Sequence, residues 1–267
     1  MKPCTSILQI PSLIIACGCA ALLPLHVVQA QANDTAPSDQ ETEIKASATV
    51  PGFGVLKDPS GECRVTTKGD KLSIAIPPGV HVFDAESGVM NAPRILQEKQ
   101  GDFTAEVTVS EEPLPPEAAS NNDRGPFEGA GLLLMVSPET YIRLERAQVR
   151  AQHDDGLVLA SYPSWELRLE SKPLRYGSSR DGVFEVGKTI SDMPVSFRIT
   201  RRGNTVSGAY RAKDGEWHEL DPLVVQLPEK VSIGVAASSN VVTPTTASFT
   251  RFSIRPADAA PAPAKTE

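Results

Sequence analysis

The chain has 267 residues, of which 40% are hydrophobic and 22% charged, and its formal net charge is −7. This composition supports a folded core, and single β-sandwiches commonly reach this length. The acidic balance argues against nucleic acid and anionic lipid as partners, because phosphate binding begins with a concentrated basic surface.

Residues 1–32 are predicted to be a signal peptide. An apolar stretch, Ile7 to Val28, ends in two overlapping A-x-A-like sites with small residues at Ala30 and Ala32. The alternative of a membrane-spanning helix is disfavoured, because two prolines, a glycine and a histidine interrupt the stretch. We therefore expect bacterial export to the periplasm or the medium, with no membrane span after leader cleavage.

Lipoprotein processing at Cys17 is a second alternative, since Ile14-Ile15-Ala16-Cys17 is similar to a bacterial lipobox. The apolar run that follows Cys17 argues against it. Cleavage of the leader would remove Cys4, Cys17 and Cys19 and leave Cys63. A single cysteine forms no internal disulfide framework, so we expect Cys63 to be a small hydrophobic residue in the fold.

After the leader, residues 33–50 are predicted to be a flexible acidic linker, and 256–267 a disordered Ala/Pro-rich tail. Residues 51–255 show alternating and β-branched runs separated by Gly, Pro, Asn and Asp, which indicate strands rather than helices. The clearest runs are 71–76, 102–109, 141–146, 165–169, 195–199, 231–235 and 249–254.

Gly131–Val136 is apolar at every position, which is typical of a strand that is covered on both faces. Turns are expected at 201–204 and 213–216. About twelve to fourteen strands of this kind suit two large antiparallel sheets packed face to face. Two segments, Pro77 to Asn91 and Glu111 to Pro126, are predicted to be long loops with little apolar content to anchor them.

Several short motifs in order resemble one family. They are Asp58-Pro59-Ser60-Gly61-Glu62-Cys63, Asn91-Ala92-Pro93-Arg94, Gly101-Asp102-Phe103-Thr104, Gly129-Ala130-Gly131-Leu132-Leu133-Leu134 and Tyr141-Ile142-Arg143-Leu144-Glu145-Arg146. Together they resemble the regulation-of-enolase protein family of the concanavalin A-like lectin/glucanase superfamily, from about Phe53 to Ile254.

The resemblance implies a concanavalin A-like jelly-roll sandwich with one concave sheet, the face that relatives use for sugars. It implies no reaction, because the family has no established activity. The hairpin Lys213–Trp217 is one residue shorter than the family's usual Asp-Gly-x-x-Trp form, which affects the expected geometry of that loop.

No catalytic residue is predicted. Glycosidases need two carboxylates on either side of the scissile bond, and the Glu-x-Asp-x-x-Glu strand pattern is absent. No zinc or nucleophile motif is present either. We expect no cofactor. Asp154-Asp155-Gly156 offers oxygen ligands of the kind that bind Ca²⁺, with a plain hairpin turn as the alternative.

The candidate ligand-binding residues are polar or aromatic groups that should share one sheet face or its rim: Asn91, Arg94, Tyr141, Arg143, Glu145 and Trp165. Trp165 could stack on a sugar ring, as aromatic side chains do at sugar-binding sites. The structural alternative is a cross-strand ion-pair network with Trp165 in the core.

We therefore hypothesise an exported, non-catalytic binding module that recognises carbohydrate or a cell-envelope partner through one sheet face. The alternatives are a carbohydrate-active enzyme, hydrolase-like or lyase-like, with a cross-strand carboxylate pair, and a protein-interaction scaffold.

Overall fold

The computed structural model describes residues 41–85, 87–111, 118–122, 125–153, 156–175, 193–213 and 215–257. These residues form strands β1 to β19, and no helix is found among them. This part of the chain contains no helix that is long and apolar enough to span a membrane. The prediction of an all-β fold with two large antiparallel sheets is confirmed.

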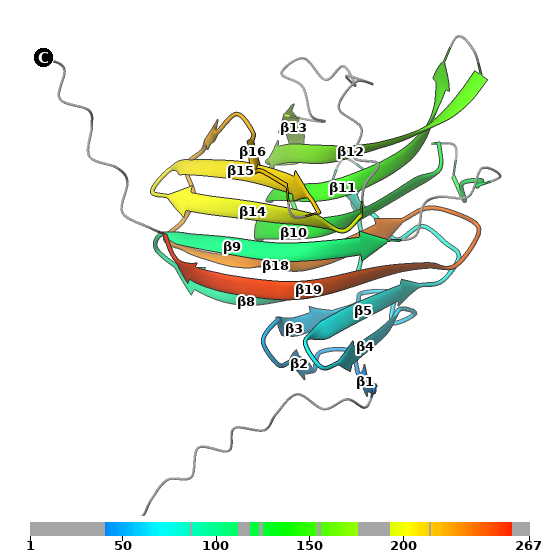
Figure 1. Ribbon diagram of the computed structural model, residues 1–267, viewed down its shortest axis with the longest axis horizontal. Helices are drawn as coiled ribbons and strands as arrows, with labels where there is room; N and C mark the ends of the chain where they lie inside the picture. The colour runs from blue at the N-terminus through cyan, green and yellow to red at the C-terminus, as the bar shows by residue number, and fades with distance from the viewer. Residues whose placement is uncertain are drawn as a thin grey trace, which may run out of the picture. The chain divides into compact units, whose positions relative to one another are not determined.

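The first large sheet, sheet A, is drawn in front in Figure 1, where β9, β14, β15 and β19 lie over the second layer. Its strands in spatial order are β1 (Thr42–Ile44), β4 (Arg64–Lys68), β5 (Lys71–Ile76), β19 (Thr245–Pro256), β9 (Phe103–Glu111), β14 (Val195–Arg202), β15 (Thr205–Ala212) and β16 (His218–Glu219), with β17 (Leu223–Val224) also pairing with β15.

The second large sheet, sheet B, lies behind it. Its strands in order are β13 (Lys172–Arg175), β12 (Gly156–Leu169), β11 (Thr140–His153), β10 (Phe127–Ser137), β18 (Lys230–Ser239), β8 (Arg94–Gln100), β3 (Gly54–Lys57) and β2 (Thr49–Val50). Every pairing in both sheets is antiparallel, and the outermost strands of each sheet are short. A small separate hairpin pairs β6 (Phe83–Asp84) with β7 (Val89–Met90).

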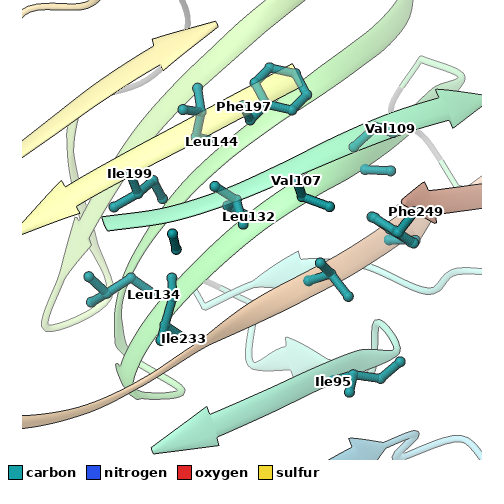
Figure 2. Packing of buried hydrophobic residues seen from close by; sticks show 14 of the residues in the cluster. Ile95, Val107, Val109, Leu132, Leu134, Leu144, Phe197, Ile199, Ile233 and Phe249 are labelled. Atoms are coloured by element: carbon teal, nitrogen blue, oxygen red, sulfur yellow. The ribbon is translucent and has the colours of Figure 1, made fainter. Parts of the chain in front are cut away.

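The core lies between the two sheets, where alternate side chains of each layer meet. Figure 2 shows Val107, Phe197 and Ile199 of sheet A in the same cluster as Leu132 and Ile233 of sheet B. All five are at most 1% exposed. Burial of such aliphatic and aromatic groups removes apolar surface from water, which is the dominant favourable contribution to folding.

Strand β10 is buried on both faces, as its continuous apolar sequence predicts. Leu132 and Leu134 point into the core between the sheets. Leu133 and Met135 point to the outer face of sheet B and pack there against Phe83 in a second cluster. The β6–β7 hairpin, residues 80–92, therefore covers part of the outer face of sheet B.

The domain boundaries differ from the prediction at the N-terminal side. Strands β1 and β2 lie within residues 33–50, which were expected to be a linker, so the sheets begin about nine residues earlier than the predicted start at 51. The polar residues of β1 were misleading because an edge strand can be exposed and still pair. The predicted signal peptide, the first part of the predicted linker and residues 258–267 of the predicted tail lie outside the described residues.

Candidate functional site

Four of the predicted site residues share the outer face of sheet B. Arg94 comes from β8, and Tyr141, Arg143 and Glu145 come from β11. The ladder connects them, because Arg94 lies opposite Ala236, Ala236 opposite Gly131, and Gly131 opposite Glu145. All four side chains are buried rather than open to solvent.

The polar groups at this face hold the β6–β7 hairpin in place. Asn91 accepts a hydrogen bond from the Val82 amide at 3.0 Å and donates one to the Val80 carbonyl at 2.6 Å. Nη1 of Arg94 donates to the carbonyls of Met90 and Ala92 at 3.2 and 3.0 Å. These bonds satisfy backbone groups of the loop, which is a structural role.

Phe83 is the apolar anchor of the hairpin. Its ring centroid lies 5.7 Å from Cζ of Arg94 and 5.8 Å from Cζ of Arg143, and its carbonyl accepts a hydrogen bond from the Tyr141 hydroxyl at 3.3 Å. Arginine over an aromatic face is attracted by the ring quadrupole. The ring thus occupies the place between two arginines where a ligand on this face would lie.

Beside this contact, charged side chains of β11 and β12 form a buried network. Nη2 of Arg143 lies 2.5 Å from Oε2 of Glu166, and Nε of Arg168 lies 2.6 Å from Oε1 of the same carboxylate. Nε of Arg143 also lies 3.2 Å from Oε1 of Glu145, an ion pair that lacks hydrogen-bond geometry. Glu166 and Arg168 were missed as partners, although they share the face of Arg143 by strand alternation.

Burial governs the ionisation of these groups. It raises the pKa of Glu145 to about 7, against the opposing effect of Arg143 and with a smaller contribution from Glu166. The same effect raises the pKa of Tyr141 and lowers the pKa of Arg94. Gly129 leaves room for the carboxyl, because a Cβ at that position would lie 2.7 Å from it.

Glu145 and Glu166 are a cross-strand carboxylate pair, the arrangement that the enzyme alternative requires. Their side chains are 2% and 0% exposed, and both oxygens of Glu166 contact arginines. A glycosidase needs its two carboxylates on either side of a bound sugar. The observed packing instead places Glu166 between the guanidinium groups of Arg143 and Arg168, with Glu145 buried beside Arg143.

Trp165 does not share this face. It is completely buried in the core between the sheets, where its Nε1 donates to the Asp221 carbonyl at 3.0 Å and its ring packs on Gly208. The expectation of a sugar-stacking surface at Trp165 is therefore wrong. Its alternation with Leu167 and Leu169 was the signal for a core position.

Cys63 is partly buried beside the core and lies near a histidine. Its Sγ is 4.0 Å from Nδ1 of His81, whose Nε2 lies 3.8 Å from Glu62. Burial raises the pKa of the Cys63 thiol to about 12, and Asp58 adds to this effect. The thiol therefore stays protonated at neutral pH, which is unsuited to a nucleophile.

The outer face of sheet A carries a different group, which we call the Trp217 cluster: Glu106, Arg198, Arg211, Trp217 and Arg255. Cζ of Arg198 lies 3.8 Å from the Trp217 ring centroid, and Cζ of Arg211 lies 4.7 Å from it. Oε1 of Glu106 accepts from Nε of Arg198 at 2.8 Å and from Nη2 of Arg255 at 3.2 Å. The indole remains partly exposed.

Hydroxyl groups flank the cluster on the same face. Thr104 and Thr200 form one cross-strand pair at 3.1 Å, and Thr108 and Ser196 form another at 2.9 Å. The Arg198–Glu106 pair lies between them in the β9–β14 register. This site was not predicted from the sequence, although Arg211 and Trp217 lie on either side of a predicted hairpin turn, which places them as cross-strand neighbours.

Acidic, histidine and cysteine side chains were considered as metal ligands. Asp154 and Asp155, which were considered for Ca²⁺, lie outside the described residues. Among the residues that are described, no three His, Cys, Asp or Glu side chains come together as a set of metal ligands.

No family model and no curated protein matches the sequence. A solved Saccharomyces cerevisiae protein of unknown function is similar in fold, with 11% identity, a TM-score of 0.58, and coverage of 77% of this chain and 97% of that one. The likeness supports the sandwich fold alone. The regulation-of-enolase resemblance stays a prediction.

Two further similar structures are larger glycoside hydrolases. The Bacteroides ovatus xyloglucan PUL protein GH43B has 14% identity and a TM-score of 0.49, over 81% of this chain and 39% of that one. The xylan β-1,4-xylosidase of Bacillus halodurans has 11% identity and a TM-score of 0.44, over 67% and 32%. This chain spans about a third of the length of these two.

Proposed function

We propose that this protein is an exported, non-catalytic carbohydrate-binding module, and that its ligand lies on the outer face of sheet A over the Trp217 cluster. The observation that carries the proposal is the partly exposed indole of Trp217, which two arginines fix over the outer face of sheet A. The face first considered, on sheet B, is instead packed under the β6–β7 hairpin.

An aromatic ring on a polar sheet face suits a sugar for two reasons. The ring offers a flat apolar surface to the C–H groups of a pyranose, while the surrounding groups form hydrogen bonds with its hydroxyls. Arg198 and Glu106 each retain 26% exposure, so their remaining hydrogen-bonding capacity is accessible to a ligand.

Binding without catalysis fits the composition of the cluster. Glu106 is its single carboxylate, and one of its oxygens accepts hydrogen bonds from two arginines. Glycoside hydrolysis by the usual route requires a second carboxyl that can donate a proton. Export is part of the proposal and rests on the predicted leader, residues 1–32, with a cell-envelope glycan or a secreted polysaccharide as the ligand.

A glycan array probed with the purified protein tests the proposal, followed by titration of each hit with tryptophan fluorescence. The sequence has two tryptophans, and Trp165 is buried, so a ligand on sheet A should change the signal of Trp217. Trp217→Ala should weaken binding at least tenfold. Val224→Ala, which shortens a side chain that is 80% exposed, is the matched control and should bind as the wild type does.

Absence of any glycan hit would overturn the proposed function. A hit that Trp217→Ala leaves unchanged would overturn the location of the site. Release of reducing ends from a bound polysaccharide would show an enzyme and contradict the non-catalytic part.

A further inference from the structure

The Trp217 cluster contains more cationic than anionic groups in close contact. Arg198 and Arg211 both lie against one indole ring, and Arg255 joins Arg198 at the Glu106 carboxylate. Glu219, on the neighbouring strand opposite Ala209, is exposed and forms no ion pair within the described part of the chain. Arg198 and Arg255 thus contact the Glu106 carboxylate, whereas Arg211 forms no ion pair with a described residue.

Arg211 is the arginine of this cluster whose guanidinium group has an unused hydrogen-bond donor. Its Nε is buried and has no hydrogen-bond partner among the described residues, and its recorded contact is with the π face of Trp217. A buried charged donor without an acceptor is costly, because it has lost its hydration. The side chain of Arg211 as a whole is partly exposed, so an anionic ligand beside the indole would bring an acceptor to its guanidinium group.

The shape of the groups favours a carboxylate. A guanidinium presents its N–H groups in a planar fork that matches two carboxylate oxygens, and such charge-assisted bonds are about twice as strong as neutral ones. The acidic chain as a whole, with net charge −7, argues against long polyphosphates such as nucleic acid. A sugar that carries a carboxyl group combines a ring for Trp217 with an anion for Arg211.

We propose that the Trp217 cluster selects saccharides that carry a carboxylate, the hexuronate class, with the sugar ring on Trp217 and the carboxylate at Arg211. This inference rests on the proposed function, because it specifies the ligand of the same site. Arg198 remains paired with Glu106 and orients the indole, while Arg211 binds the carboxylate of the ligand.

The test compares oligogalacturonate with its fully methyl-esterified form. Esterification removes the negative charge and leaves the sugar ring and its stacking surface in place. By calorimetry at low salt, the acid should bind about tenfold more tightly than the ester, as one charge-assisted hydrogen bond implies. Arg211→Gln should reduce this ratio to near one, and Trp217→Ala should weaken binding of both ligands.

Two controls complete the comparison. Arg64→Gln makes the same charge change at the far side of sheet A, where Arg64 is 61% exposed and paired with Glu43, and it should retain the tenfold ratio. A sulfated oligosaccharide that has no carboxyl group distinguishes carboxylate recognition from general attraction to anions. Equal affinity for the sulfated sugar and the uronate would overturn selection by the fork.

The outcomes separate the two proposals. An ester that binds as tightly as the acid would overturn hexuronate selection and leave carbohydrate binding intact. Binding of a neutral glycan with no binding of either galacturonate would do the same. Failure of every glycan to bind would overturn both.

Discussion

At the scale of single residues, Glu145 is a carboxylic acid that is almost completely removed from water. Its carboxyl is 2% exposed, faces Gly129 across the ladder, and has Arg143 as its cationic neighbour. Loss of hydration outweighs the attraction of Arg143, so the pKa of Glu145 rises from 4.5 to about 7. The folded protein therefore binds a proton there that the unfolded chain releases.

This proton predicts a decrease in stability as the pH rises. Between pH 4.5 and 7 the folded state keeps the proton on Glu145 and the unfolded state has lost it, so the free energy of unfolding falls across that window. The decrease should be on the order of 3 kcal/mol. Urea unfolding of Glu145→Gln, measured from pH 4.5 to 8, should show this slope greatly reduced.

The matched control for this prediction is Glu98→Gln, because Glu98 is 67% exposed and paired with Lys230 on the same sheet. That variant should keep the slope of the wild type. An unchanged slope in Glu145→Gln would show that Glu145 ionises normally in the folded protein.

The two tryptophans show how much a residue's neighbours in sequence reveal. Trp165 alternates with Leu167 and Leu169, and that pattern is sufficient to place it in the core. Trp217 follows a turn, and its pairing with Arg211 and Arg198 depends on the strand register beyond it. Alternation identifies a side chain's face, but the contacts across strands require the register.

At the scale of elements, the β6–β7 hairpin determines which sheet face is open. The strands of both sheets follow from alternation, as in 71–76 of sheet A and 231–235 of sheet B. Alternation also places Tyr141, Arg143 and Glu145 on one face, but it carries no information on whether solvent or another segment covers them. The covering segment lies some fifty residues earlier in the chain and attaches through one aromatic residue, Phe83, so its low apolar content was misleading.

Removal of that aromatic residue should loosen the hairpin and destabilise the domain. Phe83→Ala deletes a ring that contacts Arg94, Arg143 and Tyr141, and it leaves a cavity in the second cluster. We expect the free energy of unfolding to fall by about 3 kcal/mol, as for other buried aromatic truncations. Chemical denaturation measures the loss, and Val224→Ala at an exposed site should change it by less than about 0.5 kcal/mol.

Asn91 should control local opening of the same hairpin. Asn91→Ala leaves the Val82 amide and the Val80 carbonyl without their side-chain partner. Hydrogen exchange at the Val82 amide should therefore accelerate about fivefold, because one net hydrogen bond is worth about 1 kcal/mol. Exchange at Phe197 in β14 should not change. Equal acceleration at both amides would indicate global destabilisation instead.

At the scale of the whole molecule, one side chain of sheet B lies in close contact with one backbone position of sheet A. The ring of Trp165 lies against Gly208, where a Cβ would come within 3.2 Å of it. Composition and strand count predicted two facing sheets, but they do not determine which residues meet across the interface. That pairing depends on the lateral position of each strand.

A double-mutant cycle tests this contact. Gly208→Ala should destabilise the protein by about 1–3 kcal/mol through overpacking. In a Trp165→Phe background the smaller ring leaves space, so the same change should cost at least about 1 kcal/mol less. Strict additivity of the two changes would show that the residues do not meet. Ser207→Ala, on the opposite face of β15, is the control. Gly203→Ala is unsuitable as a control because the φ of Gly203 is +56°, which strains any residue with a side chain.

The short outermost strands of the two sheets affect the behaviour of the protein at high concentration. Strand β13 pairs with β12 only at Leu167–Leu169, and Pro163 lies in the part of β12 beyond that pairing. Proline has no N–H group to offer an incoming strand, which limits growth of a sheet from that side. The molecule should therefore resist strand addition by its own copies along this part of β12, which would protect it against aggregation at high concentration.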